Sequence, residues 1–241
     1  MASLDSVRQK LFRSQVLFAE LNGALREYYE TDPVGYRKAT DWSPEEPRFM
    51  FYEQKPVPAR IGLIAGDCLQ NIRSSLDYLV WELVLVAGLQ PTDRHAFPIS
   101  QSVGAYNEQL KRERLKGIVP EAIEEVRKLQ PMLLIEESAR RSHPLALLDL
   151  LTNINKHRRI LLTGMGAILS QDNSLPPGYK SLNAKSLDPF GRAGLGDFTA
   201  FVNVRDSETP TIHGFEIAGV MNTFAVFVIN DVLPNFEAFF K

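Results

Sequence analysis

The sequence has little of several features that would place it in a specialised class. Its single cysteine, Cys68, excludes an intramolecular disulfide and any cluster of cysteines around a metal. Its 27 basic and 29 acidic residues nearly cancel, so no overall field draws it to nucleic acid or an anionic membrane. No run reaches the roughly 20 apolar residues of a membrane span. We expect a cytoplasmic chain outside the membrane, with Cys68 as a buried small hydrophobe.

Motifs for common cofactor and nucleophile chemistry are also missing. The chain contains no GxGxxG or GxxxxGK stretch, which argues against a dinucleotide fold or a phosphate-binding loop. No GxSxG stretch marks a serine nucleophile, and neither Ser74 nor Ser75 has a recognisable base beside it in sequence. We therefore expect no cofactor.

Hydrophobic periodicity and turn residues predict a mainly helical chain. Helices are expected at 4–30, 61–87, 103–115, 120–129 and 144–162. A hairpin is expected within 36–57, a loop over 164–196, and strands at 198–204 and 213–220. The segment 222–233 fits either a helix, capped by Asn222-Thr223, or a strand.

These elements together predict the α+β class. We expect a single α+β domain over 1–241, with a helical core at about 1–30 and 60–163. The hairpin at 36–57 and the C-terminal region 196–241 would form a small antiparallel sheet on one side of this helical bundle.

The stretch DCLQNIRSSLDYLVWE at 67–82 carries many polar groups within the strongest predicted helix. At about 100° per residue, one side of that helix is apolar. The residues on this side are Cys68, Leu69, Ile72, Leu76, Leu79, Val80, Leu83 and Val86. The opposite side carries Asp67, Gln70, Asn71, Ser74, Asp77, Tyr78 and Trp81. Arg73 stands at the margin, four residues before Asp77, where the two can form an ion pair.

The helix predicted at 144–162 has a similar mixture. Its expected core stripe consists of Leu147, Leu150, Leu151, Ile154 and Leu161. Arg158 falls in this stripe, where a guanidinium must find an acid or reach water, and Asp67 and Asp77 are the candidate acids. On the adjacent flank, Asp149, Asn153 and His157 recur every four residues. This ladder offers too few ligands for a metal site, so none is predicted.

If the two helices pack antiparallel, their polar groups meet in what we call the polar seam: Arg73, Asp77, Asn153, His157 and Arg158. Together with Tyr78 these are the candidate ligand-binding residues. RNA cleavage requires a base and a cation near the phosphate, and these residues include both types of group. The candidate catalytic residues of such an enzyme are His157, Arg73 and Arg158. The same groups could instead serve only to lock the helices together.

The HAFPI stretch at 95–99 follows the first of these two helices. Its Phe-Pro pair favours an extended backbone, and Phe97 is a candidate for burial. We expect this stretch to be a structural tether between two helices, and the isolated histidines His95, His143 and His213 to be packing or loop residues.

Several stretches taken in order resemble a family of uncharacterised bacterial proteins. They are GDCLQNIRSSLDYLVWEL, AFPI, the LQP of residues 129–131 and LLDLLTNINKHRRIL. The family pattern is similar to GDxLHNxRSxLDHLxWxL…FPI…LQP…LxxLxNxDKHR, and the likeness covers residues 60 to 163. The family has no established activity. Its C-terminal segment ends in a helix, which favours a helix over 222–240 here.

The central helix also resembles, more weakly, the helical HEPN domains. In these domains an Arg followed after four to six residues by His forms a metal-independent ribonuclease site. The likeness pairs Arg73 with position 78, where this chain has Tyr78. Tyrosine as a residue type, with a pKa of about 10, is a poor base at neutral pH. Asn155 also replaces the Asp of the bacterial family's pattern, and both changes weaken catalysis while leaving binding intact.

Three hypotheses follow from the sequence. The first is a non-enzymatic, HEPN-like helical protein that binds RNA, a small molecule or another partner through the polar seam. The second is a metal-independent ribonuclease or phosphodiesterase. In the third, the seam is purely structural, and function lies on the loops or at an interface between copies in a homo-oligomer. A buried and fully paired seam would favour the third hypothesis, and an open cleft the first two.

Overall fold

The computed structural model describes residues 2–38, 49–157, 163–170, 180–182, 197–204 and 216–241. The α-helices are α1 (Asp5–Glu30), α2 (Ala59–Val86), α3 (Val103–Lys111), α4 (Pro120–Lys128), α5 (Glu137–Ser142), α6 (Pro144–His157) and α7 (Ile217–Phe227). Shorter helical turns are η1 (Pro131–Leu133), the π-helical η3 (Val228–Val232), η4 (Leu233–Asn235) and η5 (Glu237–Phe240). The described part is mainly helical, and the predicted helical bundle is confirmed.

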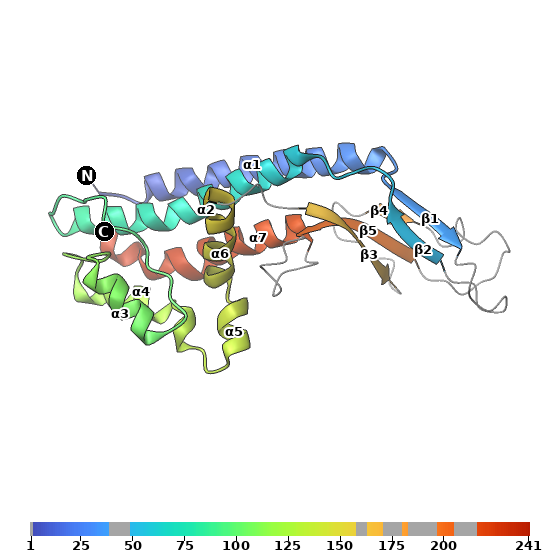
Figure 1. Cartoon of the computed structure of the whole chain (residues 1–241). Helices are drawn as coiled ribbons and strands as arrows, with labels where there is room; N and C mark the ends of the chain where they lie inside the picture. The colour runs from blue at the N-terminus through green and yellow to red at the C-terminus, as the bar shows by residue number, and fades with distance from the viewer. Residues whose placement is uncertain (1, 39–48, 158–162, 171–179, 183–196, 205–215) are drawn as a thin grey trace.

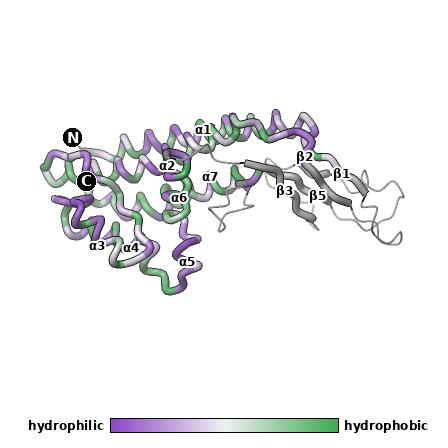
Figure 2. The backbone as a smooth tube through the Cα atoms, in the orientation of Figure 1, coloured by the Kyte–Doolittle hydropathy of each residue, from purple (hydrophilic) through white to green (hydrophobic). Residues whose placement is uncertain are grey.

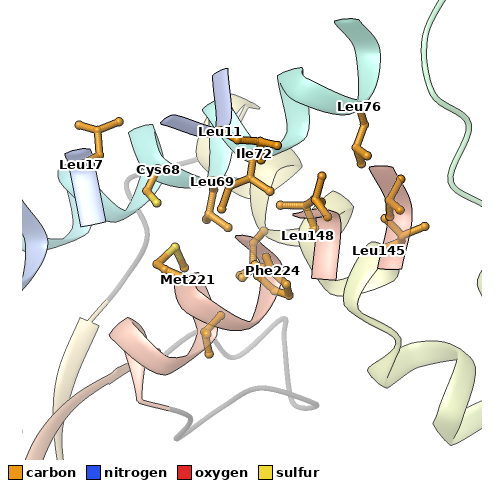
Figure 3. Packing of buried hydrophobic residues seen from close by; sticks show 14 of the residues in the cluster. Leu11, Leu17, Cys68, Leu69, Ile72, Leu76, Leu145, Leu148, Met221 and Phe224 are labelled. Carbon is orange, nitrogen blue, oxygen red and sulfur yellow. The ribbon is translucent and has the colours of Figure 1, made fainter. Parts of the chain in front are cut away.

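Four helices surround the core. Figure 1 shows α1, α2 and α7 running side by side, α6 crossing them, α3 and α4 near one end, and α5 next to α6. Hydrophobic residues alternate with hydrophilic ones along the bundle helices in Figure 2, as expected for helices buried on one side. In Figure 3, side chains from α1, α2, α6 and α7 converge on one cluster. The labelled residues are Leu11, Leu17, Cys68, Leu69, Ile72, Leu76, Leu145, Leu148, Met221 and Phe224.

The helix α2 follows its predicted pattern closely. Every residue of its predicted apolar side is buried except Val86, which is 38% exposed because it lies in the last turn. The helix ends at Gly88, whose φ of +73° is the left-handed conformation that glycine adopts at little cost. Gly88 N donates to Leu85 O and Leu89 N to Val84 O, the two bonds that close a Schellman motif. The predicted helix-ending role of Gly88 is confirmed.

The helix α6 begins at Pro144 as predicted, and the predicted burial of Leu151 and Ile154 is confirmed, but the rest of its buried side differs from the prediction. Its fully buried residues are Leu145, Leu148, Leu151 and Ile154, together with Ala146 and Thr152. Leu150, placed in the core by the sequence pattern, is 37% exposed, and Leu147 only borders the core. The helix is amphipathic with leucines on more than one side, so packing against α2 and α7 decides which are covered. Leu161 lies outside the described residues.

The strands form two separate pairings. β1 (Val34–Lys38) pairs antiparallel with β2 (Phe49–Glu53), and β5 (Asp197–Val204) lies between β3 (Thr163–Ser170) and β4 (Lys180–Leu182). No ladder joins the two groups in the described part of the chain, so the single sheet expected from the sequence is not supported. The prediction of a continuous loop over 164–196 is wrong at β3 and β4, whose only described ladders are those with β5.

The C-terminal region is helical from Ile217 onward. The predicted strand at 213–220 is wrong over Ile217–Val220, which forms the start of α7, and residues 213–215 lie outside the described part. Asn222-Thr223 is also not the cap. The cap is Glu216, whose carboxylate accepts bonds from Ala218 N at 2.8 Å and from Gly219 N. The helix expected over 222–240 from the family resemblance is confirmed as α7 and the turns after it.

One stretch, Ile217–Asn235, is long and apolar enough by composition to cross a membrane, the only such helix among the described residues. Eight of its side chains are buried in the protein core beside α1, α2 and α6. They are Ile217, Ala218, Val220, Met221, Phe224, Val228, Val232 and Leu233. This burial is what a core helix of a globular bundle would show, since a core helix passes the same test of length and composition.

Candidate functional site

Arg73 is the centre of the polar contacts on α2. Its Nη1 lies 2.6 Å from Asp77 Oδ1, one helical turn further on. Its Nη2 donates to the backbone carbonyl of Phe97 at 2.9 Å, and its Nε lies 3.7 Å from Asp149 Oδ1 on α6. The Arg73 side chain is only 13% exposed. Three nitrogens of one guanidinium are thus directed at acceptors on three different segments of the fold.

Asp77 completes a closed arrangement with the segment after α2. The same Oδ1 that accepts from Arg73 also accepts from the backbone N–H of Phe97 at 2.9 Å. Both polar backbone groups of Phe97 are therefore held by α2, while its ring is 1% exposed and lies in the core. We call Arg73, Asp77, Asp149 and the Phe97 backbone the Arg73 clamp. The predicted tether role of the HAFPI stretch and the burial of Phe97 are confirmed.

Asp149 is the member of the clamp contributed by α6. Its Oδ2 accepts from Asn153 Nδ2 at 3.1 Å, so the ladder predicted along α6 exists between these two residues. Loss of hydration on burial raises the pKa of the Asp149 carboxyl above its usual value. The Arg73 cation lowers that pKa in part, and the Asp77 carboxylate raises it further. Two carboxylates thus share one guanidinium.

The structure brings together only part of the predicted site. Arg73, Asp77 and Asn153 are connected through Asp149, which the sequence placed on the ladder but not in the polar seam. Tyr78 is not part of this cluster, because its ring lies 5.3 Å from Lys10 Nζ on α1. The side chain of His157 and the whole of Arg158 lie outside the described residues. Figure 1 shows α6 crossing α2 rather than lying along it.

Gln130 is a further polar side chain held by several hydrogen bonds, and no role was predicted for it. It is 2% exposed, and its Oε1 accepts from Ser100 N at 3.0 Å. Its Nε2 donates to Pro98 O at 2.9 Å and Val126 O at 3.0 Å. The LQP and FPI stretches of the family pattern thus bond to each other. Their co-occurrence in that pattern was the only signal available in the sequence.

The helices α2 and α6 approach each other closely at Gly66. A Cβ atom built on Gly66 would lie 2.3 Å from Asn155 Oδ1 and 2.7 Å from Asn155 Cγ. Asn155, one of the two departures from the family patterns, is therefore packed directly against the backbone of α2. The absence of a side chain at Gly66 is what permits this approach.

Within the described residues, no group of three His, Cys, Asp or Glu side chains could hold a metal ion. Gln70 donates to Ser74 Oγ at 3.1 Å, while its buried Oε1 has no hydrogen-bond partner.

In three comparisons with known proteins, no family model, no curated protein and no solved structure matches this chain. The resemblances to the bacterial family and to HEPN domains therefore stay predictions.

Proposed function

We propose that this chain is a non-enzymatic, HEPN-like helical domain whose polar seam is structural and whose function is to bind a partner through its outer surface. The observation that supports this proposal is the pairing of Arg73. Its guanidinium is directed at Asp77, Asp149 and the Phe97 carbonyl, and little of it is exposed. A cation used in this way holds α2, α6 and the FPI segment together.

The charge of the clamp also argues against an anionic ligand there. Asp77 and Asp149 both lie beside Arg73, so the described cluster holds more negative than positive charge. A phosphate approaching it would have to displace a carboxylate from the guanidinium. This favours the structural role over RNA binding at Arg73. The proposal retains the bacterial, cytoplasmic setting predicted from the sequence.

The experiment is to replace Arg73 and measure stability. In Arg73→Ala, Asp77, Asp149 and the Phe97 carbonyl lose their shared donor while remaining partly buried. Removing one partner of such a cluster costs on the order of 3 kcal/mol, so the melting temperature should fall by many degrees. The measurement is urea and thermal unfolding followed by circular dichroism.

The matched control is Arg60→Ala, in the same helix. Arg60 makes two ion pairs, with Glu20 at 3.5 Å and Glu27 at 3.4 Å, but its side chain is 57% exposed. Exposed pairs contribute less than about 1 kcal/mol, so this variant should unfold almost like the wild type. Equal stability of Arg73→Ala and Arg60→Ala would refute the structural role.

Ligand binding through the rim of the polar seam is the second candidate. It is favoured by the raised pKa of Asp149, by the exposed Asn153 and by the unpartnered Gln70 Oε1. Native mass spectrometry of the purified protein would detect a bound small molecule. Its loss in Asn153→Ala, with unfolding unchanged, would support this candidate over the structural one.

A further inference from the structure

The helix α1 has a second apolar side that faces away from the bundle. Phe12 is 66% exposed and Val16 is 41% exposed, and Ala19 is exposed as well. With Gly23 they follow each other at spacings of four, three and four residues, so they lie on one side of the helix. We call these four residues the α1 stripe. Figure 1 shows α1 at the edge of the bundle, with no other element beyond it.

The side chains of the α1 stripe become smaller from its N-terminal to its C-terminal end. The two large side chains, Phe12 and Val16, are in the N-terminal half, and the two smallest, Ala19 and Gly23, are in the C-terminal half. A Cβ atom on Gly23 would find no heavy atom within 4 Å, so nothing in the same chain requires a glycine there. Glycine inside a helix costs about 1 kcal/mol relative to alanine. The position is therefore an open notch on the helix surface.

The charged side chains on one flank of α1 also differ between its two halves. Arg13 lies beside the large residues, and Glu20 and Glu27 lie beside the small ones on the same flank of the helix. Glu20 and Glu27 both approach Arg60, at 3.5 Å and 3.4 Å, so two carboxylates share one guanidinium. That end of the flank keeps a negative excess, while the Arg13 end is positive.

We propose that two copies of this chain form a homodimer in which their α1 stripes pack antiparallel about a two-fold axis between Val16 and Ala19. In this register Phe12 enters the notch at Gly23 of the partner subunit, and Val16 packs on Ala19 of the partner subunit. Arg13 lies opposite Glu20 of the partner subunit. In each of these three contacts a large side chain meets a smaller one or a positive side chain meets a negative one, and the two-fold axis repeats each contact.

The same complementarity excludes a parallel pair. Two parallel stripes would place Phe12 against Phe12 and Gly23 against Gly23, leaving a gap at one end. They would also place like charges together along the flank. The antiparallel contact extends from Gln9 to Glu27, about 27 Å at the rise of an α-helix. A single pair of helices buries less surface than a standard interface, so the dimer is concentration-dependent.

Sedimentation velocity of the full chain over a wide concentration range tests this interface. We expect a monomer that converts to a dimer as concentration rises. Gly23→Gln fills the notch, and Phe12→Ser removes the group that enters it. Each variant should therefore raise the dissociation constant of the dimer at least about tenfold. The control is Ile135→Ser, which removes another apolar side chain, 90% exposed, that lies outside α1. A monomer at all concentrations, or unchanged affinity in both α1 variants, overturns the proposal.

Charge reversal gives a second, independent readout. Arg13→Glu places two acids opposite each other and should weaken the dimer, most strongly at low salt. Adding Glu20→Arg to the same chain restores an opposite pair in the antiparallel register and should recover affinity. If the double variant is no tighter than the single one, this register is wrong.

Cysteine cross-linking tests orientation. A chain carrying Gln9→Cys mixed with one carrying Glu27→Cys should form a disulfide-linked dimer under mild oxidation, because the two positions lie opposite each other. Gln9→Cys alone should remain uncross-linked. The native Cys68 does not interfere, since it is 1% exposed and burial raises its pKa to about 12. Efficient cross-linking of Gln9→Cys with itself would show a parallel pair and refute the proposal.

Discussion

At the scale of single residues, three polar side chains, Arg73, Asp77 and Gln130, bond to the backbone of the segment that follows α2. The Arg73 clamp holds the polar groups of Phe97, and Gln130 holds those of Pro98 and Ser100. An extended segment cannot satisfy its own backbone groups as a helix does, so burial of Phe97 requires these external partners. Polar residues that looked like candidates for chemistry thus have a structural use at this point of the fold.

The stability of Gln130 variants tests this use. Gln130→Ala leaves Ser100 N and the carbonyls of Pro98 and Val126 buried without their partner, which should cost about 2 to 3 kcal/mol in unfolding free energy. Chemical denaturation measures the loss. The control is Gln101→Ala, an exposed glutamine of the same segment, which should change stability by less than about 0.5 kcal/mol. Equal values for the two variants would contradict the role of Gln130.

At the scale of helices, the packing of α6 across α2 depends on the size of the side chains at the contact as well as on their charge. Gly66 lets Asn155 reach the backbone of α2, and about two turns further along α2, Arg73 reaches Asp149. The sequence predicted that the two helices pack together, and this is confirmed. It did not predict which leucines of α6 would face inward, because its apolar residues extend around more than one side.

Gly66→Ala tests the close approach. Alanine is the better helix former, by about 1 kcal/mol, yet its Cβ would overlap the Asn155 amide and should produce a net loss of about 1 to 2 kcal/mol. Thermal unfolding shows whether Gly66→Ala lowers or raises the stability of the protein. In Gly104→Ala the added Cβ meets nothing within 4 Å, so that variant should be neutral or slightly stabilised. A stabilised Gly66→Ala would mean that Asn155 moves aside freely.

At the scale of the whole molecule, charge and the engagement of Arg73 oppose an RNA-cleaving site. The chain has a net charge of −2, and the clamp gathers two carboxylates around one guanidinium. Tyr78, the residue that the predicted HEPN resemblance pairs with Arg73, has its ring 5.3 Å from Lys10 Nζ. A partner-binding protein is consistent with these features, and a nuclease would need His157 as its base.

We therefore expect no metal-independent cleavage of single-stranded RNA by the purified protein. Proton abstraction from a ribose hydroxyl needs a base that titrates near the working pH, which tyrosine as a residue type does not provide. A fluorescent RNA assay in the presence of a chelator measures the rate. Cleavage that disappears in both Arg73→Ala and His157→Ala, with circular dichroism unchanged, would establish the ribonuclease hypothesis instead.

Local patterns in the sequence determined a large part of this protein. The ranges of α1 and α2, the end of α2 at Gly88, and the burial of Cys68 and Phe97 all follow from periodicity, glycine geometry and apolar content. The pair Arg73–Asp77 was also predictable, because residues four apart on a helix are neighbours whatever the rest of the chain does.

The tertiary structure decided the features that depend on partners distant in sequence. The strands β3 and β4 pair with β5, and the stretch beginning at Ile217 became a helix because Glu216 caps it and the core covers it. Asp149 joined Arg73 because α6 crosses α2 where Gly66 allows it. Propensity and periodicity describe a segment alone, whereas pairing and burial depend on which surfaces the fold brings together.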